Sequence, residues 1–116
     1  MNYFIAPGLK RIHPQLALMD SITKYIASSN ATTPEAIKSK SRVRKIKEAR
    51  FECMYILKKC TSMTYAYIGD YYNRDHASVI HAVNTIAFEM EYDREIKAYI
   101  KEVMKYFGIA KRKLKK

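Results

Sequence analysis

The sequence contains no tryptophan, only three glycines, three prolines and two cysteines among its 116 residues. So few glycines and prolines exclude a collagen-like or low-complexity chain. The two cysteines, Cys53 and Cys60, fall on one predicted helix about two turns, or roughly 10 Å, apart, which is too far for a disulfide. We therefore interpret them as small core residues of a protein from a reducing compartment.

Membrane-targeting and catalytic patterns are missing as well. No apolar run approaches the roughly 18 residues of a membrane span, and the N-terminus has no signal-peptide pattern. An enzyme would need a nucleophile with its base, paired carboxylates or a cofactor loop, and the phosphate-binding pattern G-x-x-x-x-G-K-[ST] does not occur. We expect a cytoplasmic protein that is not an enzyme and binds no ATP, cofactor or membrane.

Acidic residues are scarce, with 11 Asp and Glu against 22 Lys and Arg, so that the net charge is +11 and the pI is near 9.7. The cations are concentrated in residues 38–47 and 111–116, whereas acids gather between Glu89 and Glu95. Segregated positive charge of this size favours a polyanionic partner over a merely soluble basic protein.

Apolar residues recur at three- and four-residue intervals along most of the chain, and no stretch alternates in the manner of a strand. This periodicity predicts helices over residues 14–28, 33–38, 45–60, 64–72, 75–90 and 93–107, with Gly108 after the last one. In the 45–60 helix, Ala49, Cys53 and Leu57 face inward, and Lys47, Arg50 and Lys58 are expected outside. The fold class is all-α, a compact domain of about five to six helices.

The most informative stretch is Thr64–Ala82, TYAYIGDYYNRDHASVIHA. Thr64 is a plausible N-cap, Asn73 can adopt the positive φ of a tight turn, and Asp75 can cap a second helix. That helix carries Val79 and Val83 on its inner face and a polar, exposed first turn. A short helix, a tight turn and a second helix of this kind are typical of a DNA-binding helix-turn-helix at the centre of the domain.

These residues resemble the C-terminal DNA-binding domain, domain IV, of the bacterial replication initiator DnaA. The residues that carry the resemblance are Arg44, Ala49, Arg50, Met54, Tyr55, Ile68, Gly69 and the run Arg74–Ala82. The likeness covers roughly residues 19–107 and implies a DnaA C-terminal or Trp-repressor-like fold. Two departures stand out, because many members have two residues where this turn has only Asn73, and because Ala77 replaces a hydroxyl residue.

The resemblance implies a stand-alone, nucleoid-associated DNA-binding domain that reads one short asymmetric DnaA-box-like site as a monomer, in control of replication initiation or transcription. It implies base contacts from Asp75, His76 and Ala77 in the major groove and from Arg44 in the minor groove. It also implies contacts to the DNA backbone, which we assign to Lys45, Lys47, Arg50, Lys58, Thr61, Thr64, Tyr65, Arg74, Ser78 and His81. The DnaA-like domain would span residues 14–108, between an irregular lead-in (1–13) and a basic tail (109–116).

Several alternatives remain open. Residues 39–44 could be a solvated linker rather than a DNA-contacting arm. His76 and His81 point about 140° apart on a helix, which disfavours a metal site. The tyrosines could form a stacking surface for single strands, although packing is favoured. A different function class is a helical interaction module that binds or antagonises a host initiator without reading DNA, and contacts with other replication proteins are compatible with either class.

Overall fold

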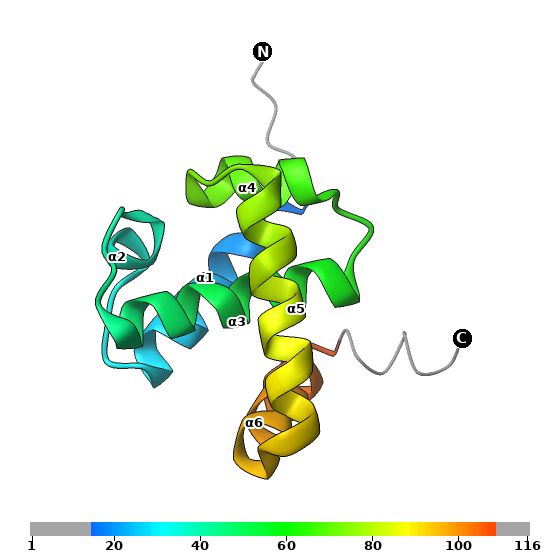
Figure 1. Ribbon diagram of the computed structural model, residues 1–116. Coiled ribbons are helices and arrows are strands. Elements are labelled where there is room, and N and C mark those ends of the chain that lie inside the picture. The colour runs from blue at the N-terminus through cyan, green and yellow to red at the C-terminus, as the bar shows by residue number, and fades with distance from the viewer. Residues whose placement is uncertain (1–14, 109–116) are drawn as a thin grey trace.

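The computed structural model describes residues 15–108, which form six α-helices and no strand (Figure 1). The helices are α1 (Leu16–Ser29), α2 (Pro34–Lys38), α3 (Arg44–Cys60), α4 (Tyr65–Tyr72), α5 (His76–Tyr92) and α6 (Arg94–Phe107). The all-α prediction is confirmed, and every expected helix is present with its ends within two residues of the expected bounds. The lead-in 1–13, Pro14 and the tail 109–116 lie outside the described residues.

Helix α3 is the centre of the domain because it packs against each of the other five helices. Its inner face buries Ala49, Cys53 and Leu57, as the apolar periodicity predicts. Burial raises the pKa of the Cys53 thiol to about 12, so this side chain behaves as a small apolar group of the core. In Figure 1, α5 crosses in front of α3 with one end beside α4 and the other beside α6.

Side chains at the helix ends explain where four of the helices begin. In each case an oxygen of the capping residue accepts a hydrogen bond from a backbone N–H of the first turn, which would otherwise lack a partner. The N-caps are Thr33, Thr64, Asp75 and Asp93. Asn73 and Gly108 adopt the left-handed conformation that ends α4 and α6, with φ of 60° and 73°.

A buried polar contact fixes the end of α4 in the core. The hydroxyls of Tyr72 and Thr23 lie 2.7 Å apart, and Thr23 also donates to the Met19 carbonyl at 2.7 Å. Because both hydroxyls are paired, burying them leaves no polar group unsatisfied there. Tyr72 is fully buried, and the other tyrosines expected to pack, Tyr65, Tyr67, Tyr71 and Tyr99, are half-buried. The packing interpretation of these tyrosines is confirmed.

Candidate nucleic-acid interface

The turn between α4 and α5 is closed by a very tight backbone contact. The Arg74 N–H donates to the Gly69 carbonyl at 2.8 Å, and Asn73 takes the left-handed conformation between them. A Cβ atom built on Gly69 would lie only 2.4 Å from the Arg74 carbonyl oxygen. Glycine at 69 therefore allows the chain to reverse within the three residues, Asn73 to Asp75, that separate the two helices.

The first turn of α5 presents polar side chains to solvent. The Asp75 carboxylate accepts from the Ser78 N–H at 2.9 Å, and this backbone hydrogen bond is the main cause that lowers the Asp75 pKa. His76 and Ala77 are exposed, whereas Ser78 is half-buried. The carboxylate has two oxygens and several lone pairs, so capping the helix leaves it able to accept from a ligand.

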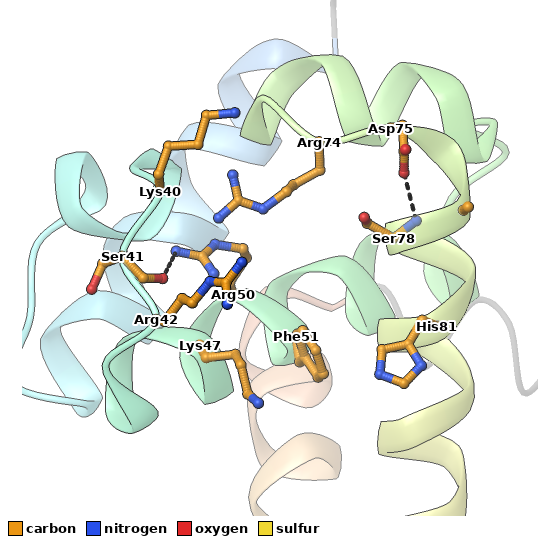
Figure 2. Close-up of a pocket in the computed structure, with 11 residues that line it drawn as sticks. Lys40, Ser41, Arg42, Lys47, Arg50, Phe51, Arg74, Asp75, Ser78 and His81 are labelled. Carbon is orange, nitrogen blue, oxygen red and sulfur yellow. Dashed lines mark hydrogen bonds between the residues drawn. The ribbon is translucent and has the colours of Figure 1, made fainter.

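An open groove of about 870 Å³ lies between this turn, the N-terminal half of α3 and the segment that joins α2 to α3 (Figure 2). Positive side chains dominate its lining and Asp75 is the one acid in it. The lining residues are Lys40, Ser41, Arg42, Lys47, Arg50, Phe51, Arg74, Asp75, Ala77, Ser78 and His81. The groove brings together seven of the residues that sequence reasoning assigned to DNA.

Arg50 corrects the sequence prediction, because it does not face outward. The residue is only 4% exposed, and its guanidinium donates to the carbonyls of Ile37, Ser39 and Ser41 at 2.7, 3.0 and 3.1 Å. Burial, and next the charge of Arg74, lower its pKa. Helical periodicity predicted an exposed Arg50, since it considers α3 alone. The segment that covers Arg50, residues 37–41, comes from another part of the chain, and periodicity cannot place it.

Arg44 and Lys45 do not line this groove. Arg44 is the first residue of α3 rather than part of an extended arm, and its side chain, 89% exposed, forms an ion pair with Glu48 at 3.1 Å. It lines a second groove of about 560 Å³ together with Arg42 and Glu89. Lys45 donates to the Ala31 carbonyl at 3.0 Å and so lies beside the loop between α1 and α2.

Another group of assigned residues lies where α3 ends and α4 begins. Lys58 donates to the Met63 carbonyl at 3.1 Å, and its ammonium lies 4.4 Å from the centre of the Tyr65 ring. Thr61 follows α3, and Thr64 caps α4. Figure 1 shows this loop on one side of α5 and α2 on the other. The assigned residues therefore flank the first turn of α5 on two sides.

Four residues of the groove were not named individually as DNA contacts from the sequence. Lys40, Ser41 and Arg42 lie in the 39–44 segment interpreted as a DNA-contacting arm, but periodicity could not say which of its side chains face the groove. Phe51 is half-buried and meets His81 edge-to-face, with ring centres 5.7 Å apart. A signal was available in its spacing, because Phe51 lies one helical turn after Lys47 on the same face of α3.

Among residues 15–108, no three His, Cys, Asp or Glu side chains come together as a metal site would require. Over the same range, no helix combines the length and the apolar character needed to cross a bilayer.

The sequence of this chain is similar to known proteins over the helices and the turn that form this site. The family model for the bacterial dnaA protein helix-turn-helix matches residues 19–86, which include α3, α4, the turn and most of α5. The chain is 35% identical over 88 residues to the chromosomal replication initiator protein DnaA of Thermodesulfovibrio yellowstonii, which covers 75% of this chain and 20% of the relative. For the DnaA of Bacteroides thetaiotaomicron the identity is 31% over 100 residues, covering 85% and 21%. The chain thus spans about a fifth of the length of these curated relatives.

Proposed function

Because the chain belongs to the bacterial DnaA helix-turn-helix family, we propose that it binds double-stranded DNA sequence-specifically, at a DnaA-box-like site, in control of replication initiation or transcription. The observation that carries the proposal is the cationic groove beside the exposed first turn of α5. Such a surface combines the electrostatic attraction that holds the phosphates with a helix end able to reach base edges. We propose that one copy binds one asymmetric site.

In this proposal α5 is the recognition helix and enters the major groove with its first turn. The lowered pKa of Asp75 keeps it an acceptor at neutral pH, which suits the amino group of a cytosine. His76, exposed at the first helical position, reaches a base edge or a thymine methyl. The Ala77 methyl contacts a thymine methyl.

The phosphates flank this helix on both sides. Lys47, Arg74, Ser78 and His81, which line the groove beside α3, hold one strand. Lys58, Thr61, Thr64 and Tyr65, around the start of α4, hold the other, since the major groove that admits a helix is bounded by two phosphate backbones. Arg50, only 4% exposed and donating to three carbonyls, supports these phosphate contacts from beneath rather than contacting the DNA itself.

A minor-groove contact comes from the region around the start of α3. Sequence reasoning assigns it to Arg44, whose ion pair with Glu48 is exposed and therefore weak enough to exchange for DNA. Arg42 is the structural competitor, because it is exposed in the segment before α3 and lines both grooves. Narrow A·T segments attract either side chain.

The proposal is tested by fluorescence anisotropy with a labelled duplex that contains a DnaA-type box and with a scrambled duplex. We expect tighter binding to the box and an affinity that falls steeply between about 50 and 200 mM salt, because bound cations release counterions. Equal, salt-insensitive binding of the two duplexes would contradict the proposal.

Single alanine variants of Arg44 and Arg42 separate the two minor-groove candidates. The residue that enters the groove should, when replaced, weaken binding and relax the preference at an A·T position beside the box. Lys97→Ala, an exposed cation on α6, is the control and should affect all duplexes alike. If both arginine variants behave like Lys97→Ala, neither arginine enters the minor groove.

A protein-interaction module is the second candidate function. Phe88 and Tyr92 are 63% and 73% exposed on α5 with ring centres 4.9 Å apart, and the acids Glu89 and Glu91 lie beside them. Exposed aromatic side chains of this kind are common at protein interfaces. The protein-interaction hypothesis is favoured if His76→Ala keeps full sequence preference in competition with scrambled DNA, because α5 would then not lie in the major groove as proposed.

A further inference from the structure

The segment between α2 and α3, residues 39–43, is irregular and lies beside the recognition helix; we call it the connector. Its exposed side chains Lys40 and Arg42 line the groove. Within the connector, the Ser41 and Val43 N–H groups donate to the Ser39 and Ser41 hydroxyls. The Ser39 and Ser41 carbonyl groups have no helical partners and need donors from elsewhere. Its position therefore depends on side chains from other elements.

Arg50 supplies one set of these contacts. From the interior of α3 it donates through Nε to Ile37 and through one terminal nitrogen to Ser39 and Ser41. These three carbonyls span the end of α2 and the first half of the connector. A guanidinium can meet them together because its donors lie in one rigid plane, whereas a lysine ammonium is a single point of charge.

The turn of the helix-turn-helix supplies the other set. A terminal nitrogen of Arg74 donates to the Ser39 carbonyl at 2.9 Å, and the Asn73 side-chain amide donates to the Lys38 carbonyl at 3.3 Å. The Ser39 carbonyl thus receives hydrogen bonds from two arginines, Arg50 and Arg74. Figure 2 shows both guanidinium groups directed toward the connector.

The shared carbonyl links the connector to the first turn of α5. Arg74 directly precedes Asp75, the N-cap of α5, so its main chain is fixed to the recognition helix. The ammonium of Lys38 also lies 4.1 Å from the centre of the Tyr71 ring, which joins α2 to α4. The connector and the first turn of α5 are therefore held at one separation before any ligand arrives.

We propose that Arg50 is a positioning residue, with Arg74 as its partner, that sets the distance between the connector cations and the first turn of α5 and thereby the spacing of contacts along the DNA. The inference rests on the proposed DNA binding and deepens it. A preorganised connector binds without losing conformational freedom, and it accepts one spacing between base contacts and connector contacts. A loose connector would bind phosphates on any DNA but would lose that preference.

The test is Arg50→Lys, which keeps the charge and removes the planar set of donors. We expect binding to a box duplex to weaken by about tenfold, because the contacts are no longer held in the productive geometry. Binding to scrambled DNA and its salt slope should stay nearly unchanged, because the number of cations is the same. Inserting one base pair between the A·T segment and the rest of the box should harm the variant less than the unaltered protein.

Lys47→Ala is the matched control, since Lys47 is an exposed cation of the same groove and the same helix. It should weaken binding to both duplexes by a similar factor and reduce the salt slope by about one phosphate contact. If Arg50→Lys binds the box as tightly as the unaltered protein, or weakens both duplexes equally, Arg50 does not position the connector.

Two further measurements distinguish a failure of the positioning role from a failure to fold and from a failure to bind DNA. Hydrogen exchange without DNA should be faster in Arg50→Lys at the amides of Ser41 and Val43, which donate to Ser39 and Ser41 hydroxyls, while the α3 amides stay protected. Unchanged exchange at these two amides would overturn the positioning role even if the protein binds no DNA. If Arg50→Lys does not fold, Asn73→Gly takes its place, because it keeps the positive φ and removes the hydrogen bond to the Lys38 carbonyl. We expect Asn73→Gly to lose the spacing preference as well. An Asn73→Gly variant that keeps this preference would also overturn the inference.

Discussion

The two ends of α5 have the same buried face but opposite exposed chemistry. Val79 near the first turn and Ile86 further along are both buried, so packing against α3 continues through the helix. At the N-terminal end the exposed side chains adjoin the groove that Arg74 and Lys47 line. At the C-terminal end, Phe88 and Tyr92 are exposed among acids, and α6 begins with the acidic cap Asp93.

The buried stripe of α5 determines where the helix packs, whereas its exposed side chains determine what it can bind. DNA would be attracted to one end of α5 and repelled by the acids near the other. The polarity of the exposed face thus supports entry into the DNA by the N-terminal end, which leaves the aromatic end accessible.

The largest expected effect is on stability, and it contrasts Gly69 with Gly108, the two glycines within residues 15–108. Gly69→Ala places a Cβ against the Arg74 carbonyl oxygen at the turn, where the backbone on both sides is fixed, and we expect it to lower the free energy of unfolding by about 3 kcal/mol. Gly108→Ala at the end of α6 meets open space and pays only for its positive φ, about 1 kcal/mol. Urea unfolding followed by circular dichroism measures both, and equal losses would mean that the turn relaxes around the added carbon.

The next largest effect is on DNA discrimination, and it contrasts His76 and Phe88, two exposed rings at opposite ends of α5. His76→Ala should remove about 1–3 kcal/mol of discrimination between the box and scrambled DNA, while nonspecific binding through the groove cations remains. Phe88→Ala should leave both affinities unchanged, because that end lies away from the DNA. Competition binding distinguishes the outcomes, and a loss of discrimination in Phe88→Ala would mean that the two ends have been assigned the wrong way round.

A smaller effect is expected at Ala77. Ala77→Thr should tighten binding to a DnaA-type box by the order of 1 kcal/mol, because it adds a hydroxyl that can bond a phosphate or a base. Asn84→Thr is the control, an exposed position on the same helix two turns further along, and it should change nothing. The dissociation constants of the two variants are measured on the same box duplex. If both substitutions change the affinity equally, the first turn of α5 does not lie in the major groove.

The smallest effect concerns pH and Glu52, which lies on α3. Burial, offset in part by the hydrogen bond from Asn30 and reinforced by Glu48 and Glu89, raises the Glu52 pKa from 4.5 to about 7. A folded-state pKa above the unfolded value means that the folded protein holds the proton more tightly, so this contribution to stability is lost as pH rises from 4.5 toward 7.

Glu52→Gln should therefore flatten the decline of the melting temperature over that pH range. Asp75 has the opposite sign, because its lowered pKa contributes stability that is lost as pH falls through the folded value. Thermal melts of Glu52→Gln between pH 4.5 and 7, and of Asp75→Asn below the ordinary Asp value of 3.8, give the comparison. A slope in Glu52→Gln as steep as in the unaltered protein would exclude Glu52 as its source.

Much of the fold could be predicted from the sequence because its signals are local. The caps Thr64 and Asp75 and the left-handed residues Asn73 and Gly108 act on backbone groups within a few residues, so a single sequence reveals them. Helical periodicity likewise identified the buried faces of α3 and α5. The family resemblance rests on the same stretch, since the residues that define the turn also define the motif.

The position of the connector and the direction of Arg50 depend on contacts between segments that are distant in the sequence. The three carbonyls that Arg50 reaches are nine to thirteen residues earlier in the chain, in or beside a segment without periodicity. The carbonyl that it shares with Arg74 joins residues 35 positions apart. The apolar periodicity of a helix shows which of its faces is buried. It contains no information about carbonyl groups of another segment that come to lie beside that helix. For that reason the helix-turn-helix could be recognised from local sequence alone. Which arginines face solvent, and which bind the backbone beside the groove, follows from the packing of α2 against α3.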